Sequence, residues 1–253
     1  MGIQYGNITL YKVEQSDIVN YLSGIGEDAY VSPTIDRFTT VYLSSVEENV
    51  QKQILNLDKL DSYFRVIINR YKDTLGLFVF WAYHLSKIFH CSALAVFVYD
   101  GSCFWYHLAK NGVMLDEYTT CAGDGWQPGQ AIEELSFQIK GGNAEILSST
   151  FNKQEFVEQI QIILGKASGF NQKDFFNLTR YEALLKMPSY DSPVTRHEAI
   201  ARFLEICPGL VLGLNYSTLE TGELGDLWSD FQDRERDNCQ TLEEIELEIQ
   251  KTT

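Results

Sequence analysis

The hydrophobic pattern between positions 94 and 119 is interrupted twice by turn-forming dipeptides. Asp100-Gly101 and Asn111-Gly112 each lie between runs of β-branched and aromatic residues, which is the strongest short-range signal for a β-hairpin. The pattern predicts a three-stranded antiparallel meander over residues 94–99, 102–109 and 113–119. Because two-residue loops fix the register, the pattern also predicts which side chains face each other.

Other segments alternate apolar and polar residues with a period of two or form short apolar runs, as strands do. They predict further strands over residues 8–13, 30–32, 38–43 and 210–214. Apolar residues recurring every three or four positions predict helices instead. These helices are expected over residues 16–24, 47–71 and 75–89, from 152 to about 164, and from 193 to about 206.

Strands and helices do not alternate regularly along the chain, so an α+β fold is expected rather than a doubly wound parallel sheet. A mixed or antiparallel sheet would join the meander to residues 8–13 and 38–43 and pack with helices. The chain is expected to form a single α+β domain over residues 1–222, with a long helical insertion at about 47–90. Residues 223–253 would form an acidic C-terminal tail with a short amphipathic helix that begins at Thr241.

The formal net charge of the chain is −15. This charge opposes binding to nucleic acid or to anionic lipid, which bind proteins rich in Lys and Arg. From Glu220 onward, eleven acidic residues accompany only Arg234, Arg236 and Lys251, so more than half of the excess lies there. This segment is either a solvated tail that aids solubility or an arm that docks on a basic protein surface.

The chain offers no signal for a leader, a membrane anchor, a metal site or a cofactor. Its longest apolar stretch, residues 75–83, is about half of the roughly 20 residues that a membrane-spanning helix needs. Five cysteines are scattered without CxxC spacing, so no zinc or thioredoxin-type site is expected. A cytoplasmic protein with reduced thiols follows, in which Cys91, Cys103 and Cys207 are small core residues.

The predicted register of the meander places His107 opposite Asp116, with Trp105 and Tyr118 on the same face. A carboxylate that orients an imidazole is half of a general-base arrangement. The nucleophile is missing, because Cys103 on the same face would lie about 13 Å from His107 at about 3.3 Å per residue. The alternative is a cross-strand hydrogen bond at a partly covered sheet surface.

Two further features are candidate parts of a site. Trp126 lies in a Gly- and Pro-rich loop over residues 121–129, which lacks the spacing of a phosphate-binding loop. It would cover a site on the meander or plug the end of the sheet. His197 and Glu198 lie near a predicted helix N-terminus, where they would serve a site or pack against a loop.

Several short motifs occur in a fixed order along the chain. They are Ala29-Tyr30-Val31-Ser32-Pro33, Ala93 to Asp100, Leu115-Asp116-Glu117-Tyr118 with Cys121, and Arg196-His197-Glu198-Ala199. Over residues 5–222 the chain resembles a family of uncharacterised bacterial proteins of cyanobacterial type. The family has no established activity, so the resemblance implies no catalytic residue. The helical segment at 47–71 and the acidic tail depart from its pattern.

Two hypotheses of function follow. The first is a non-enzymatic protein-interaction or regulatory module whose partner is another protein or a second copy of itself. It expects that truncation after Gly222 leaves the body folded and abolishes partner capture. The second is a small-molecule binding or hydrolytic site on the meander face, built from His107, Asp116, Trp105 and Tyr118 and covered by the Trp126 loop.

Overall fold

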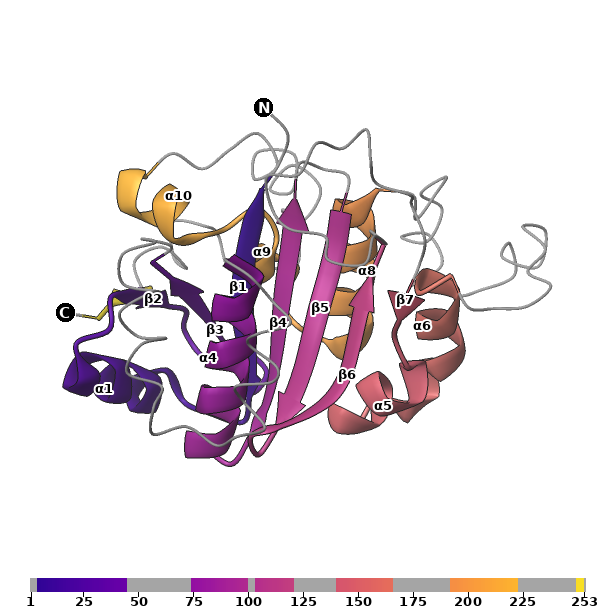
Figure 1. Ribbon diagram of the computed structural model, residues 1–253, viewed down its shortest axis with the longest axis horizontal. Coiled ribbons are helices and arrows are strands. Elements are labelled where there is room, and N and C mark those ends of the chain that lie inside the picture. The colour runs from indigo at the N-terminus through magenta and orange to yellow at the C-terminus, as the bar shows by residue number, and fades with distance from the viewer. Residues whose placement is uncertain are drawn as a thin grey trace.

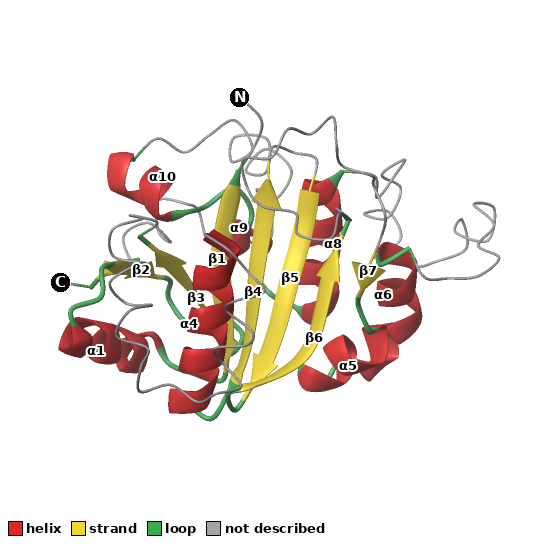
Figure 2. Cartoon of the chain, viewed as in Figure 1, coloured by secondary structure: helices red, strands yellow, loops and turns green. Residues whose placement is uncertain are grey.

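A central antiparallel sheet carries helices on both of its faces (Figures 1 and 2). This arrangement is seen in a computed structural model, which describes residues 4–44, 74–99, 103–120, 140–165, 192–222 and 249–252. The α+β class expected from the sequence is confirmed. The long helix predicted over 47–71, the loop with Trp126 and the helix predicted from Thr241 lie outside the described residues.

Eight strands of the described residues pair in the order β7-β6-β5-β4-β1-β3-β2-β8. Every neighbouring pair is antiparallel. The strands are β1 (Tyr5–Tyr11), β2 (Ala29–Val31), β3 (Phe38–Leu43), β4 (Ser92–Tyr99), β5 (Cys103–Lys110), β6 (Val113–Thr119), β7 (Lys140–Gly141) and β8 (Gln250–Lys251). The meander β4-β5-β6 and its junction with β1 and β3 therefore agree with the prediction.

Alternate residues of each central strand enter two separate hydrophobic clusters. In β5, Phe104, Tyr106 and Leu108 belong to one cluster, whereas Trp105 and Ala109 belong to the other. This alternation follows from the two-residue period of a strand. Because helices cover both faces, β4 is an almost continuous apolar run and not an alternating one.

The helices divide between the two faces. Figure 1 shows α4 in front of the sheet and α8 behind it. Residues of α1 (Gln15–Ile25) and α4 (Thr74–Ile88) pack on the face of Trp105, and residues of α5, α6, α8 and α9 pack on the face of Tyr106. The bounds of the remaining helices are α5 (Ala144–Thr150), the 3₁₀ turn η3 (Gln154–Phe156), α6 (Val157–Ile163), α8 (Pro193–Leu204), α9 (Pro208–Val211) and α10 (Tyr216–Thr221).

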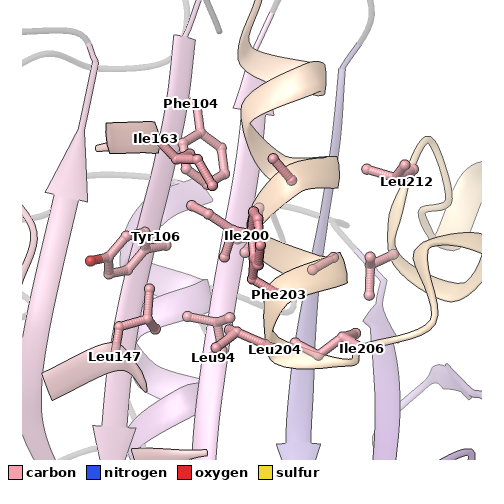
Figure 3. Packing of buried hydrophobic residues seen from close by; sticks show 14 of the residues in the cluster. Leu94, Phe104, Tyr106, Leu147, Ile163, Ile200, Phe203, Leu204, Ile206 and Leu212 are labelled. Carbon is pink, nitrogen blue, oxygen red and sulfur yellow. The ribbon is translucent and has the colours of Figure 1, made fainter. Parts of the chain in front are cut away.

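The cluster under α8 joins this helix to the central strands. Figure 3 shows side chains of α8 lying against those of β4 and β5; the labelled ones are Ile200, Phe203 and Leu204 from the helix and Leu94, Phe104 and Tyr106 from the sheet. Leu147 of α5 and Ile163 of α6 complete this contact from the side. The apolar spacing that predicted the helix after Pro193 thus corresponds to its packing face.

Three elements differ from the sequence-based expectations. Residues 210–214 do not form a buried strand, because Pro208 starts the short helix α9 instead. Helix α5, capped by the Asn143 side chain, was not predicted. Strand β8 extends the sheet with residues from the end of the chain, so the predicted tail over 223–253 returns to the domain at residues 249–252.

Helix α4 and the sheet pack tightly at Gly6 of β1. A Cβ atom at this position would lie 2.5 Å from Phe78 and 2.8 Å from Phe97. We expect Gly6→Ala to lower the free energy of unfolding by about 1–3 kcal/mol, the usual cost of overpacking a core. Urea denaturation monitored by circular dichroism measures this change.

Gly24→Ala in α1 is the matched control, since nothing lies within 4 Å of the position that its added methyl group would occupy. The control should keep or raise the unfolding free energy by up to about 1 kcal/mol, because alanine restricts the unfolded chain. Equal losses in the two variants would contradict the tight contact at Gly6.

Candidate functional site

The predicted register of the meander is correct near its second turn, as far as Met114, and wrong from Leu115 onward. Asn111 and Gly112 both have positive φ, as the turn requires, and Ala109 faces Met114 as predicted. The ladder then shifts, so that Leu108 faces Asp116 and residue 115 is the extra residue of a β-bulge. All later side chains of β6 consequently lie on the opposite face from the one predicted.

This shift separates Asp116 from His107. The carboxylate of Asp116 lies on the face of Tyr106, whose hydroxyl donates a 2.6 Å hydrogen bond to Asp116 Oδ2. The backbone N–H of Asn143 donates to the same oxygen at 2.7 Å. Asp116 therefore anchors the residue that caps α5, and the predicted pair with His107 is not formed.

Tyr118 is likewise separated from Trp105. It faces Tyr106 and not Trp105, and its ring is fully buried under the helices. Its hydroxyl donates to the carbonyl of Leu164 at 3.3 Å and accepts from Arg196 at 2.8 Å. The four side chains predicted to line one pocket therefore divide between the two faces of the sheet.

On the α4 face, the register brings Glu117 opposite His107. The indole N–H of Trp105 donates to Glu117 Oε1 at 2.8 Å, and His107 and Trp105 are 1% and 3% exposed. A carboxylate is thus again present near the imidazole, although it is not the predicted one. The bulge places Glu117, and not Asp116, opposite His107. The sequence gives no clear signal for this bulge.

Cys103, on the same face of β5, is disulfide-bonded, whereas Cys91 and Cys207 are free. The expectation that all the thiols are reduced is therefore wrong for Cys103. A disulfide-bonded sulfur cannot serve as a thiolate nucleophile, so Cys103 does not supply the nucleophile that the sequence left missing. Burial raises the pKa of the Cys91 thiol to about 12, so this free thiol is not activated either.

Helix α8 carries consecutive polar residues into the core beneath it. Arg196, His197 and Glu198 are each less than 9% exposed. His197 Nδ1 lies 2.9 Å from the hydroxyl of Tyr5, and burial lowers the pKa of His197 to about 3. Burial also raises the pKa of Tyr5, with a further contribution from Glu198. At neutral pH the pair is therefore uncharged, and it attaches α8 to β1.

The charged neighbours of His197 have structural partners. Arg196 donates to the carbonyl of Ile163 at the C-terminus of α6, where a cation stabilises the helix dipole. Glu198 forms an ion pair with Arg202 at 2.8 Å, one helical turn away. The polar motif that the sequence offered as a candidate site thus connects helices α6 and α8 to the sheet.

The last residues of the chain are fixed at the opposite edge of the sheet. We call residues 249–252 the C-terminal clasp. Lys251 pairs with Tyr30 of β2, and the Thr252 N–H donates to the Ala29 carbonyl at 2.8 Å. The Thr252 hydroxyl accepts from the Ala29 N–H at 2.8 Å and donates to the Glu27 carbonyl at 2.5 Å. The clasp thereby covers the outer edge of β2.

The ammonium of Lys251 lies among two rings and two carboxylates, which together we call the cage: Asp28, Tyr30, Tyr216 and Glu220. Its Nζ lies 5.3 and 5.2 Å from the centroids of the two tyrosine rings. It also lies 3.7 Å from Asp28 and 3.5 Å from Glu220. Burial and the hydrogen bond to Asp28 raise the pKa of Tyr216 to about 12, so its hydroxyl stays protonated. Sequence reasoning missed the cage because residues distant in the chain build it.

The part of the chain that the structure describes shows neither a metal site nor a membrane span. It contains no group of three or more His, Cys, Asp or Glu side chains placed to hold a metal ion. Nor does it include a helix with the length and apolar character needed to cross a membrane.

Comparisons with known proteins do not identify the chain. No protein-family model, no curated protein and no solved structure matches it. The resemblance to an uncharacterised bacterial family therefore stays a prediction.

The buried His197 predicts a specific response to acid. The unfolded imidazole binds a proton near pH 6.5, whereas the folded one stays neutral to about pH 3. Between these values the unfolded state binds more protons, so the free energy of unfolding falls as the pH decreases below 6.5. We expect this residue to account for about 2 kcal/mol of the loss between pH 7 and pH 5.

Urea denaturation at pH 7 and pH 5 measures the effect in the wild type and in His197→Gln. The variant should lose less stability between the two pH values. The control is His90→Asn, which replaces a histidine at a positive-φ, exposed position and should keep the wild-type pH dependence. If His197→Gln also keeps that dependence, His197 is not the buried group that responds.

Proposed function

We propose that this protein is a non-enzymatic protein-interaction module whose acidic segment, residues 223–248, binds a basic surface of a partner protein. The observation that carries the proposal is the position of the two elements that flank this segment. Helix α10 ends at Thr221, and the clasp begins at residue 249. Lys251 of the clasp lies 3.5 Å from Glu220 of α10, so the acidic segment starts and finishes at the same edge of the sheet.

This attachment changes the physical character of the segment. Residues 223–248 contain ten acidic and two basic residues, and they connect two fixed points instead of extending from one. Closing the ends reduces the number of conformations of the segment before it meets a partner. Less conformational entropy is then lost on binding.

The chemistry of the partner follows from the charge. A segment with a net charge of −8 attracts a surface rich in Lys and Arg and repels acidic surfaces. The same charge opposes binding to nucleic acid and to anionic membranes. Association should weaken with increasing ionic strength, because exposed charges are screened over about 10 Å at 0.1 M salt.

The described residues do not support a small-molecule or hydrolytic site built from His107, Asp116, Trp105 and Tyr118 on the meander face. Asp116 and Tyr118 lie on the other face of the sheet from His107 and Trp105. Cys103 is disulfide-bonded. On the face of Trp105 and His107, both side chains are buried, at 3% and 1% exposed. A cytoplasmic location stays a prediction, and the disulfide at Cys103 does not support it.

Truncation after Gly222 would be an ambiguous test of this proposal. It would remove β8 and leave the edge of β2 without its hydrogen bonds, so binding could be lost for either reason. Full-length variants avoid this problem. In the segment variant, five acids of residues 223–248 become amides: Asp226, Asp230, Asp233, Asp237 and Glu243. In the control variant, five exposed acids of the body become amides: Glu14, Asp17, Asp36, Glu155 and Glu158.

Each variant removes five negative charges from the same net −15. We expect the segment variant to recover at least about tenfold less partner after affinity purification from the host lysate, since exposed ion pairs contribute about 0.2–1 kcal/mol each. The control variant should recover the wild-type amount. Quantitative mass spectrometry measures both. Full recovery by the segment variant, or equal losses in the two variants, would contradict the proposal.

A further inference from the structure

The cage has the composition of a site that binds an amine, although the ammonium group that it holds belongs to Lys251 of the same chain. Two aromatic rings and two carboxylates around one ammonium group form the arrangement that recognises amines and their methylated forms in many proteins. The rings of Tyr30 and Tyr216 lie 5.1 Å apart at an angle of 52°. The Tyr216 hydroxyl donates to Asp28 at 2.6 Å, which fixes one ring relative to one carboxylate.

The edge of β2 recognises three features of the strand that covers it. The backbone of β2 pairs with Gln250 and Lys251 in an antiparallel ladder. The cage receives the ammonium of Lys251. The next side chain, Thr252, is only 1% exposed and has its hydroxyl bonded to the backbone of Glu27 and Ala29. The edge thus accepts an extended strand in which lysine precedes a small hydroxyl residue.

The clasp occupies all three residues of β2, because Gln250 and Lys251 pair with Val31 and Tyr30 and Thr252 bonds the backbone of Ala29. It contributes a ladder of two residues, and residues 222–248 separate it from α10. Such a linker holds a tethered strand at an effective concentration in the millimolar range. A strand on another molecule that makes only the same contacts gains nothing over the clasp. A partner strand displaces the clasp if its concentration exceeds this level or if it makes contacts in addition to those of the clasp.

We propose that the outer edge of β2, with the cage, is a binding site for an extended Lys-Thr or Lys-Ser segment of another protein, and that the C-terminal clasp is its intramolecular competitor. Binding adds a strand to the sheet, as in other cases of β-augmentation. This site is independent of the acidic segment, because the evidence for it is the contacts of the clasp and not the charge of residues 223–248.

A labelled peptide with the sequence of residues 247–253, Leu-Glu-Ile-Gln-Lys-Thr-Thr, tests the site by fluorescence anisotropy. The receptor is the full chain carrying Lys251→Ala and Thr252→Ala, which weaken the clasp. We expect saturable binding that is at least about tenfold tighter than to the wild type, where the tethered strand competes. Replacing the peptide lysine by glutamine should weaken binding by about tenfold.

The controls separate this proposal from the preceding one. The peptide carries no net charge apart from its ends, so the segment variant with five amides should leave its affinity for the clasp-weakened chain unchanged. The proposal is overturned if the folded receptor, checked by circular dichroism, does not bind the peptide, or if the lysine and glutamine peptides bind equally. Dimers of the wild type that Lys251→Ala abolishes would also overturn it, because the occupant would then be a second copy.

A measurement on the unaltered protein covers the case in which the double variant does not fold. The Thr252 amide is hydrogen-bonded to the Ala29 carbonyl and should exchange slowly with deuterium. Lysine peptide at a concentration above the millimolar level of the tethered clasp should accelerate the exchange of this amide by displacing the clasp, and the glutamine peptide should do so about tenfold less. Unchanged exchange with excess lysine peptide would contradict displacement.

Discussion

The pairing of β1 with β4 joins the N-terminal part of the sheet to the meander, and the remaining structure depends on it. Seven residue pairs connect the two strands, from Tyr5 with Val98 to Tyr11 with Ser92. Helices cover both faces at this position, so side chains of β1 enter one core or the other. At Gly6 the strand approaches α4 so closely that a methyl group would collide with Phe78. The two helical layers are thus positioned by one shared strand.

Polar side chains within this framework determine where the rear helices sit. Tyr5 reaches His197 in α8, and Asn7 donates a 2.8 Å hydrogen bond to the carbonyl of Val211 at the end of α9. Tyr42 of β3 donates to the neighbouring carbonyl of Leu210. Buried polar groups require such partners, and here the partners lie on different elements. The buried tyrosines and the histidine therefore act as connections between sheet and helices.

The sequence predicted those parts of the fold that local patterns control. The bounds of β3 and β6 agree with the pattern, and the turn at Asn111 and Gly112 has the expected positive φ values. The bulge at Leu115 could not be predicted, because a single extra residue leaves the apolar pattern of β6 almost unchanged. Its consequence is large, since the side chains of Asp116, Glu117 and Tyr118 lie on the opposite face of the sheet from the predicted one. The clasp was also missed, because two strand residues after an acidic segment carry no periodicity.

The central claim is that α10 and the clasp hold the two ends of the acidic segment, so that the segment is tethered and is not a free tail. Nuclear Overhauser effects in the full-length protein test this claim most directly. We expect contacts between the Lys251 side chain and the rings of Tyr30 and Tyr216, and a cross-strand contact between Thr252 and Ala29. Random-coil chemical shifts for residues 249–252, without these contacts, would contradict it.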